Sequence, residues 1–298
     1  PPRSTLFPYT TLFRSTQSPL ETNLGTGIRY RFDFQPNSPS DPIHLQLNIA
    51  QYQTGILSSF LTFELIATNE SDQVMEINSI SPITVNKKND GGVFLAAKPE
   101  DLIAFENGLS FALEFFPRAV TAREESESMY MQMLYAKADH SKNILLGVLS
   151  LEPYLPEVML NEDDNEWLEV DGKEGIAEWR AHLTFPFPKK LYPGDSLSSG
   201  VWVLRLNAPT GFAALEDYAN WIRIYNNIRL WRHDIPHGWN SWNNPVEGFR
   251  EYSYVTDVNE EIILSNMDIA IKNLKNFGLK YWQLDSGYAG NLLVDEVD

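Results

Sequence analysis

The sequence has no cysteine, is short of basic residues and lacks any long apolar run. Of its 298 residues, 23 are Lys or Arg and 40 are Asp or Glu, which gives a formal net charge of −17. Without cysteine the chain can form neither a disulfide nor a thiolate metal site. The acidic balance argues against nucleic acid as a partner, because phosphate groups repel it. No apolar run approaches the ~20 residues of a membrane span, so a membrane partner is not expected either.

The composition that remains is that of a globular protein. Hydrophobic residues make up 43% of the chain and aromatic residues 12%, with 8 Trp, 13 Tyr and 16 Phe. Such a chain can fill a core, which excludes wholesale disorder. At roughly 150 residues per domain, the length predicts about two domains.

The first fifteen residues, 1–15, resemble the translation of a common sequencing adapter, residue for residue. We therefore interpret them as a disordered artefact and leave them out of the fold prediction. On this interpretation the true N-terminus is unknown, a signal peptide cannot be sought, and the compartment stays unknown.

Residues 16–210 show the pattern of an antiparallel β-sandwich. Apolar and polar residues alternate, most clearly from Trp179 to Phe185, and turn clusters such as Pro193-Gly194-Asp195 separate the runs. Many strands with few helical windows are typical of such a sandwich. The other expected strands are His44–Ala50, Phe60–Ala67, Val74–Ile80, Ile144–Leu151 and Val201–Leu206.

The pattern changes after residue 210. Apolar residues at helical spacing predict a linker helix over residues 211–232. From residue 233 to 298, a short strand at His237–Asn240, a helix with the apolar stripe from Ile263 to Phe277, and a strand at Leu279–Leu284 form a β-α-β unit. The pattern therefore predicts an antiparallel β-sandwich followed by the start of a parallel sheet or barrel.

The residues that could bind a ligand follow the two strands of this unit. The first strand leads into Gly238–Asn243, which contains two tryptophans, and the second leads into Leu284–Tyr288, which contains a carboxylate. Folds with parallel strands bind ligands at the carboxyl ends of those strands. An indole packs on the apolar face of a pyranose, and a carboxylate accepts hydrogen bonds from its hydroxyls. The pattern predicts a sugar site.

These motifs resemble the start of the catalytic barrel in α-galactosidases of glycoside hydrolase family 36, a relative of family 27. The resemblance implies the fold class, an antiparallel β-sandwich followed by the truncated start of a (β/α)8 TIM barrel. The matching segments are Pro236–Trp242, a helix near Asn259 and Phe277–Tyr288. The resemblance implies that Trp242 lines the pocket of the terminal sugar and that Asp285 binds its 4- and 6-hydroxyls. Ser286 stands where the family has a second Asp, and it offers an uncharged hydroxyl instead. The resemblance implies that the ligand is a terminal α-linked galactose or a related sugar.

The resemblance also implies retaining hydrolysis by an Asp nucleophile and an Asp acid/base that follow later barrel strands. Neither is assigned in this chain, so it is expected to be an inactive N-terminal fragment of the enzyme. The expected partner is an oligosaccharide or glycoside, and no metal or organic cofactor is implied. Two alternatives stay open: a raffinose-synthase-type galactosyl transfer enzyme, and a non-catalytic carbohydrate-binding protein that uses the sandwich. Asp285 could also simply cap a helix.

Overall fold

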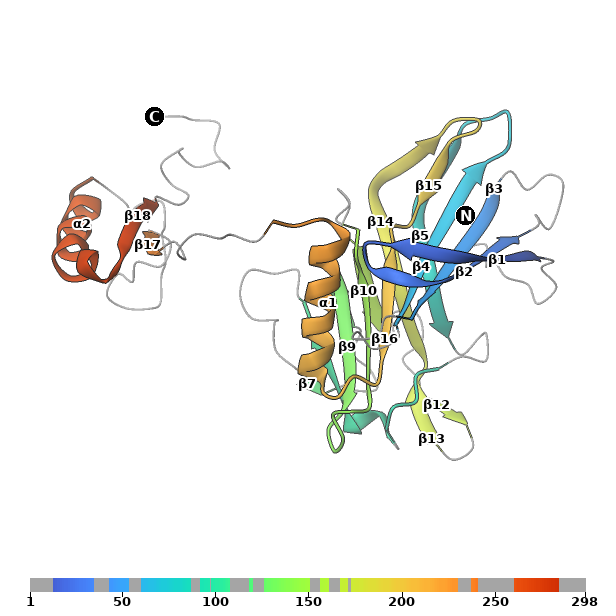
Figure 1. The fold of residues 1–298 in the computed structure, drawn as a ribbon, viewed down its shortest axis with the longest axis horizontal. Helices are drawn as coiled ribbons and strands as arrows, with labels where there is room; N and C mark the ends of the chain where they lie inside the picture. The colour runs from blue at the N-terminus through green and yellow to red at the C-terminus, as the bar shows by residue number, and fades with distance from the viewer. Residues whose placement is uncertain are drawn as a thin grey trace. The chain divides into compact units, whose positions relative to one another are not determined.

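The chain forms two compact units, Pro1–Ile228 and Arg229–Asp298, in a computed structural model (Figure 1). The structure describes residues 13–34, 43–53, 60–86, 92–96, 98–107, 118–119, 126–150, 156–160, 167–170, 173–229, 237–240 and 260–283.

The first unit is built on a ten-stranded antiparallel sheet. Its strands lie in the order β1-β2-β3-β4-β16-β10-β9-β6-β7, and β15 pairs with the far half of β4. The bounds are β1 (Phe13–Thr22), β2 (Gly25–Phe34), β3 (Ile43–Tyr52), β4 (Phe60–Asn69), β6 (Leu102–Glu106), β7 (Arg118–Ala119), β9 (Met131–Ala136), β10 (Asn143–Val148), β15 (Ser196–Ser198) and β16 (Trp202–Leu206). A 3-10 turn, η2 (Pro99–Asp101), precedes β6.

A second antiparallel sheet packs against the first. Its order is β5-β14-β11-β8, and a separate hairpin is formed by β12 and β13. The strands are β5 (Met75–Asn86), β8 (Ser126–Met129), β11 (Pro156–Leu160), β12 (Trp167–Val170), β13 (Lys173–Ile176) and β14 (Glu178–Leu191). The alternation that predicted a strand at Trp179–Phe185 is confirmed in β14, where Trp179, Ala181, Leu183 and Phe185 are all buried.

A buried polar pair lies in the core between the two sheets. Leu134 of β9, Trp202 of β16 and Trp179 of β14 belong to the same buried cluster. The indole nitrogen of Trp179 donates to Oε1 of Gln132 at 2.7 Å, and both side chains are buried. This bond joins the two sheets and satisfies a group that would be costly to bury alone.

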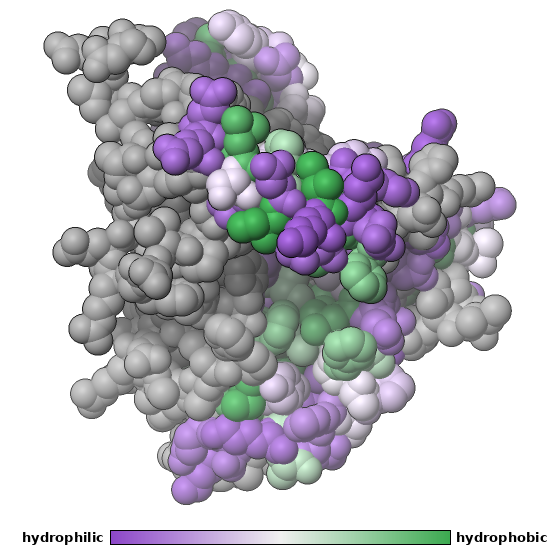
Figure 2. Space-filling model, turned by 90° about the vertical axis from the view of Figure 1, so that its left-hand side faces the viewer, coloured by the Kyte–Doolittle hydropathy of each residue, from purple (hydrophilic) through white to green (hydrophobic). Residues whose placement is uncertain are grey.

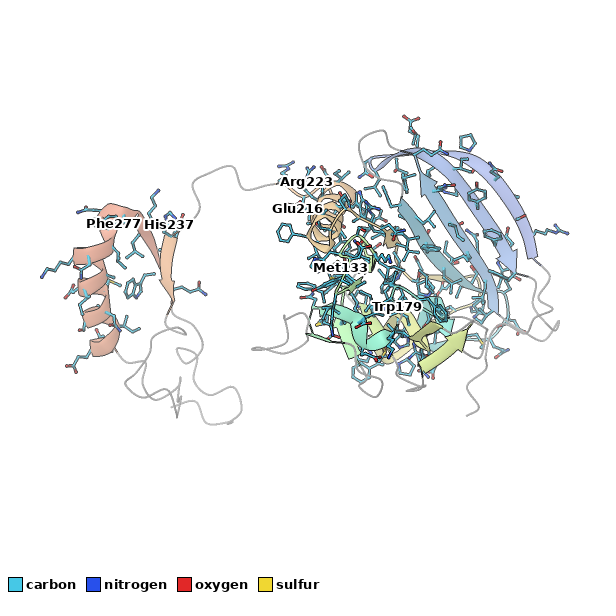
Figure 3. The ribbon with its side chains drawn as sticks, turned by 90° about the horizontal axis from the view of Figure 1, so that it is seen from below. Met133, Trp179, Glu216, Arg223, His237 and Phe277 are labelled. Atoms are coloured by element: carbon cyan, nitrogen blue, oxygen red, sulfur yellow. The ribbon has the colours of Figure 1, made fainter. Side chains whose placement is uncertain are left out.

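The other face of the ten-stranded sheet is partly covered by α1 (Gly211–Tyr225). Met131 and Met133 of β9 pack with this helix, whereas Leu134 of the same strand packs between the sheets, as alternation along a strand requires. Figure 3 shows Met133 close to α1. On the helix, Trp221 stacks on Phe60 with ring centroids 4.2 Å apart. The helix predicted after residue 210 therefore packs as a third layer of the sandwich unit.

Polar contacts fix both ends of α1. The Thr210 side chain accepts a hydrogen bond from the backbone nitrogen of Ala213 at 3.1 Å and so caps the first turn. Nδ2 of Asn226 donates to the carbonyl of Leu149 at 2.8 Å at the other end. Since the buried guanidinium of Arg205 also pairs with Asp217 at 3.1 Å, the helix is held along its length.

The free edge of β1 carries a proline. The carbonyl of Thr26 accepts from the nitrogen of Gln53, so even-numbered β2 residues bond to β3 and odd-numbered ones bond to β1. The β1–β2 register then directs the backbone of Pro19 away from β2. Proline costs no ladder bond there and protects the edge. Residues 13–15, set aside as adapter-like, begin this strand and pair with Phe32–Phe34.

The second unit contains one β-α-β arrangement. The bounds are β17 (His237–Asn240), α2 (Glu260–Leu274), the 3-10 turn η4 (Lys275–Phe277) and β18 (Leu279–Gln283). Ile263 and Ala270 of the predicted apolar stripe are buried. Gly278 has φ +100°, the left-handed geometry expected of a glycine that ends a helix.

The predicted opening of a (β/α)8 barrel is wrong. In the described part of the chain, most residues lie in antiparallel sheets, and the α-helices are α1 and α2. After residue 229 the described strands are β17 and β18, which pair with each other. One β-α-β unit is a local arrangement shared by many folds, whereas a barrel needs eight strands to close. The strand-helix-strand pattern was interpreted correctly, and the choice of an eight-stranded barrel over a parallel sheet came from the resemblance.

Candidate functional site

The carboxyl ends of β17 and β18 lie at the same edge of a two-stranded parallel sheet. Trp239 is opposite Trp282, and Asn240 is opposite Gln283. Because parallel strands run in the same direction, the segments that follow them leave from neighbouring points. This is the geometry that the sequence motifs need if their residues are to meet at one ligand.

The predicted site residues Trp242, Asp285 and Ser286 lie outside the described residues. In the sequence, Trp242 comes two residues after Asn240, and Asp285 comes two residues after Gln283. The structure thus brings together the strand ends that lead to them. The roles of the three side chains stay a prediction.

His237 lies beside the turn that ends the helical segment. A Cβ atom added to Gly278 would lie 3.1 Å from Nδ1 of His237, so the ring packs closely on this glycine. Figure 3 shows His237 and Phe277 at the same end of the unit. His237 therefore packs against this turn.

The second unit exposes several large apolar side chains. Leu264, Ile271 and Leu274 of α2 are about half exposed, and Phe277 is 83% exposed. Figure 2 shows hydrophobic residues lying among hydrophilic ones on the surface of the molecule that faces the viewer. The apolar stripe predicted from Ile263 to Phe277 is therefore buried at Ile263 and Ala270 but exposed at Leu274 and Phe277.

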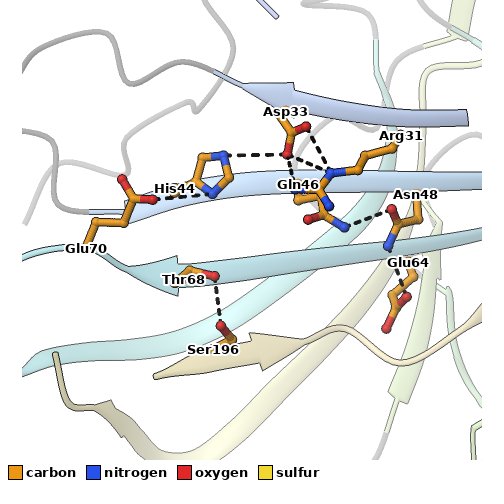
Figure 4. Close-up of polar contacts among 9 residues, drawn as sticks. All are labelled: Arg31, Asp33, His44, Gln46, Asn48, Glu64, Thr68, Glu70 and Ser196. Carbon is orange, nitrogen blue, oxygen red and sulfur yellow. Dashed lines mark hydrogen bonds and ion pairs between the residues drawn. The ribbon is translucent and has the colours of Figure 1, made fainter. Parts of the chain in front are cut away.

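A polar network lies on the first unit, on the part of the large sheet beyond α1 (Figure 4). Nε2 of Gln46 donates to Oδ1 of Asn48 at 2.9 Å, and Nδ2 of Asn48 donates to Oε2 of Glu64 at 3.3 Å. The hydroxyl of Ser198 donates to Oε1 of Glu64 at 2.8 Å. Hydrogen bonds therefore run from two sides toward one carboxylate, across β3, β4 and β15.

Ile66 lies within this network. The register pairs it with Gln46 on one neighbouring strand and with Ser198 on the other. Along its own strand, Glu64 and Thr68 are the next residues on the same face. An apolar side chain is thus surrounded by four polar ones. We call the seven residues of this surface the Ile66 patch: Gln46, Asn48, Glu64, Ile66, Thr68, Ser196 and Ser198.

A charged group adjoins the Ile66 patch on β2. Arg31 contacts the carboxylate of Asp33 with a shortest distance of 2.8 Å, and this hydrogen-bonded guanidinium lowers the pKa of Asp33 from its usual value. His44 lies between two carboxylates, with Nε2 3.8 Å from Asp33 and Nδ1 3.7 Å from Glu70. These pairs are partly exposed, so their contribution to stability is small.

Neither a metal-binding cluster nor a membrane-spanning helix occurs among the described residues. Within those ranges, no group of three or more His, Asp or Glu side chains is placed to hold a metal ion. Neither α1 nor α2 has the length and apolar character that crossing a bilayer requires.

No protein-family model matches the chain, and no curated protein matches it. A functional proposal therefore depends on the geometry of the chain and on the resemblance of its motifs.

The Ile66 patch was missed by the sequence analysis, although a signal for it exists. The alternation that placed Leu45 and Leu47 in the core also places His44, Gln46 and Asn48 on the opposite face. The two amide side chains, Gln46 and Asn48, are the signal in the sequence that marks this face as a candidate polar surface.

Proposed function

We propose that the chain is part of a carbohydrate-active protein whose ligand is a terminal α-linked galactose or a related sugar. The proposed sugar-binding residues are Trp242, Asp285 and Ser286. The observation that carries the proposal is the in-register parallel pairing of Asn240 with Gln283, which starts the two motif segments side by side.

The three side chains offer complementary chemistry to a pyranose. The indole of Trp242 supplies an apolar surface for the C–H face of the ring. The carboxylate of Asp285 accepts charge-assisted hydrogen bonds from hydroxyls, and the Ser286 hydroxyl both donates and accepts. A site with one apolar wall and a few fixed polar groups is typical of small-molecule recognition. Hydrolysis of the α-galactosidic bond is the reaction that we propose for the whole protein.

The proposal is tested by titrating the full chain with methyl α-galactopyranoside and comparing variants. We expect Trp242→Ala and Asp285→Asn each to raise the Kd at least about tenfold, which corresponds to ~1.4 kcal/mol. Asp268→Asn makes the same chemical change at an exposed position of α2 and should leave the Kd unchanged. Unchanged affinity in both site variants would contradict the proposal. Hydrolysis by the whole protein is tested separately, by measuring release of the aryl group from an aryl α-galactoside.

A further inference from the structure

We propose that the Ile66 patch of the first unit is a second carbohydrate site, which binds a neutral oligosaccharide. The ligand class follows from the chemistry of the patch itself and does not depend on the proposed function of Trp242 and Asp285.

The centre of the patch is apolar and its border is polar. Ile66 faces away from the sandwich interior, because its strand neighbours Leu65 and Ala67 belong to the buried cluster between the sheets. It is only partly buried, and Gln46 and Ser198 flank it across the neighbouring strands. A hexopyranose has a matching distribution, with C–H groups on its face and hydroxyls around its edge.

The polar border is held in place before any ligand binds. Asn48 accepts a hydrogen bond from Gln46 and donates one to Glu64, and Glu64 also accepts from Ser198. Thr68 and Ser196 form a further hydroxyl pair, with their oxygen atoms 2.8 Å apart. Side chains that are already ordered lose little entropy on binding. Each carboxylate oxygen keeps another acceptor position and each amide has a second N–H, so the border can still bind hydroxyls.

The composition of the patch favours a sugar over a protein or an anion. Protein interfaces depend on large buried anchors. In the parts of the first unit that the structure describes, the exposed large hydrophobic side chains lie outside β3, β4 and β15. The carboxylate of Glu64 at the meeting point of the hydrogen bonds repels phosphates and acidic groups. A neutral ligand with many hydroxyls satisfies all of these conditions.

The test is a titration of the full chain, monitored by ligand-observed NMR, with raffinose and with maltotriose as probes. The patch variants are Glu64→Gln and Ile66→Asp, and Asn48→Ala is a milder third variant. Glu76→Gln on β5 is the matched control, because the Glu76 side chain is 57% exposed and belongs to the other sheet. Far-UV circular dichroism confirms that each variant keeps its β content.

We expect at least one probe to bind with a Kd near 1 mM and the patch variants to raise that Kd at least about tenfold. Glu76→Gln should leave this binding unchanged, and Asp285→Asn should leave the binding of maltotriose unchanged, because maltotriose has no galactose. If Asp285→Asn abolishes all binding while the patch variants bind normally, the patch proposal is overturned and the proposed function stands. If only the patch variants lose binding, the patch is supported, and the Asp285 site is tested separately with methyl α-galactopyranoside. Absence of binding by both probes overturns the patch.

Discussion

Two buried tryptophans of the first unit differ in one chemical respect. Trp221 is 0% exposed and Trp179 is 2% exposed. Nε1 of Trp179 donates to Gln132 at 2.7 Å, whereas Nε1 of Trp221 has no hydrogen-bond partner among the described residues. Substitution by phenylalanine removes the same atoms at both positions. It breaks a hydrogen bond only at Trp179.

The expected costs follow from this difference. The lost ring volume should destabilise both variants by roughly 1–2 kcal/mol, between the costs of small and large truncations in a core. At Trp179 the change also withdraws a donor from the buried Gln132, which adds roughly 1–3 kcal/mol. At Trp221 it removes a buried unsatisfied donor, which offsets part of the packing loss. We therefore expect Trp179→Phe to be less stable than Trp221→Phe by about 2 kcal/mol.

The measurement is urea unfolding followed by far-UV circular dichroism, with the free energy of unfolding extrapolated to water. Phe212→Ala on α1 is the control, because Phe212 is 71% exposed and its removal should change stability by less than about 0.5 kcal/mol. Equal losses in the two tryptophan variants, or a larger loss for Trp221→Phe, would refute the reasoning. The Trp221–Phe60 stack would then outweigh the unsatisfied indole.

Three further predictions concern pH, packing and edge protection. Burial, aided by Arg180, lowers the pKa of His182 from 6.5 to about 4, so the unfolded chain takes up the proton first on acidification. This contribution to stability is complete above pH 6.5 and is lost as the pH falls toward 4; after discounting for partial exposure it amounts to ~1–2 kcal/mol. His182→Gln should flatten the pH dependence of urea unfolding in that window, and an unaltered slope would exclude His182 as its source. A Cβ on Gly147 would lie 2.6 Å from the Tyr218 ring, so Gly147→Ala should lower the free energy of unfolding by roughly 1–3 kcal/mol, and a neutral result in urea would show that α1 can move away at no cost. Pro19→Thr restores an outward N–H on β1 and should increase concentration-dependent self-association in analytical ultracentrifugation; an unchanged sedimentation coefficient would argue that the edge is protected by other means.

Local patterns predicted individual elements well. The alternation around Trp179 identified β14, and the apolar spacing after residue 210 identified α1. The unit from His237 to Gln283 was also predicted as strand, helix and parallel strand. In each case the signal lies within a short window, where side-chain periodicity reports directly on one buried face.

The sheet order could not be obtained in this way. Trp202 of β16 pairs with Phe63 of β4, and β10 lies between β16 and β9. Such pairings join segments far apart in the sequence, and period-two alternation does not specify the partner strand. The hairpin of β1 and β2 was missed, because residues 13–15 were set aside and the rest of β1 has few apolar residues. A signal exists in β2, where Ile28, Tyr30, Phe32 and Phe34 alternate with charged residues. The candidate sugar residues Trp242, Asp285 and Ser286 depend on the resemblance and on the shared strand edge.

On the outer face of the large sheet, strand β3 has a partly exposed polar part and an apolar part that α1 covers. On β3, the outward positions Gln46 and Asn48 are polar, whereas Ala50 and Tyr52 are apolar and buried in the cluster that includes α1. The change occurs within one step of the pleat, so it marks where the helix ceases to cover the sheet. An exposed strand face needs polar side chains to keep the protein soluble. Solubility does not require those side chains to be hydrogen-bonded amides around an isoleucine. The proposed second carbohydrate site depends on this polar network beyond α1, in which Glu64 accepts hydrogen bonds from Asn48 and Ser198.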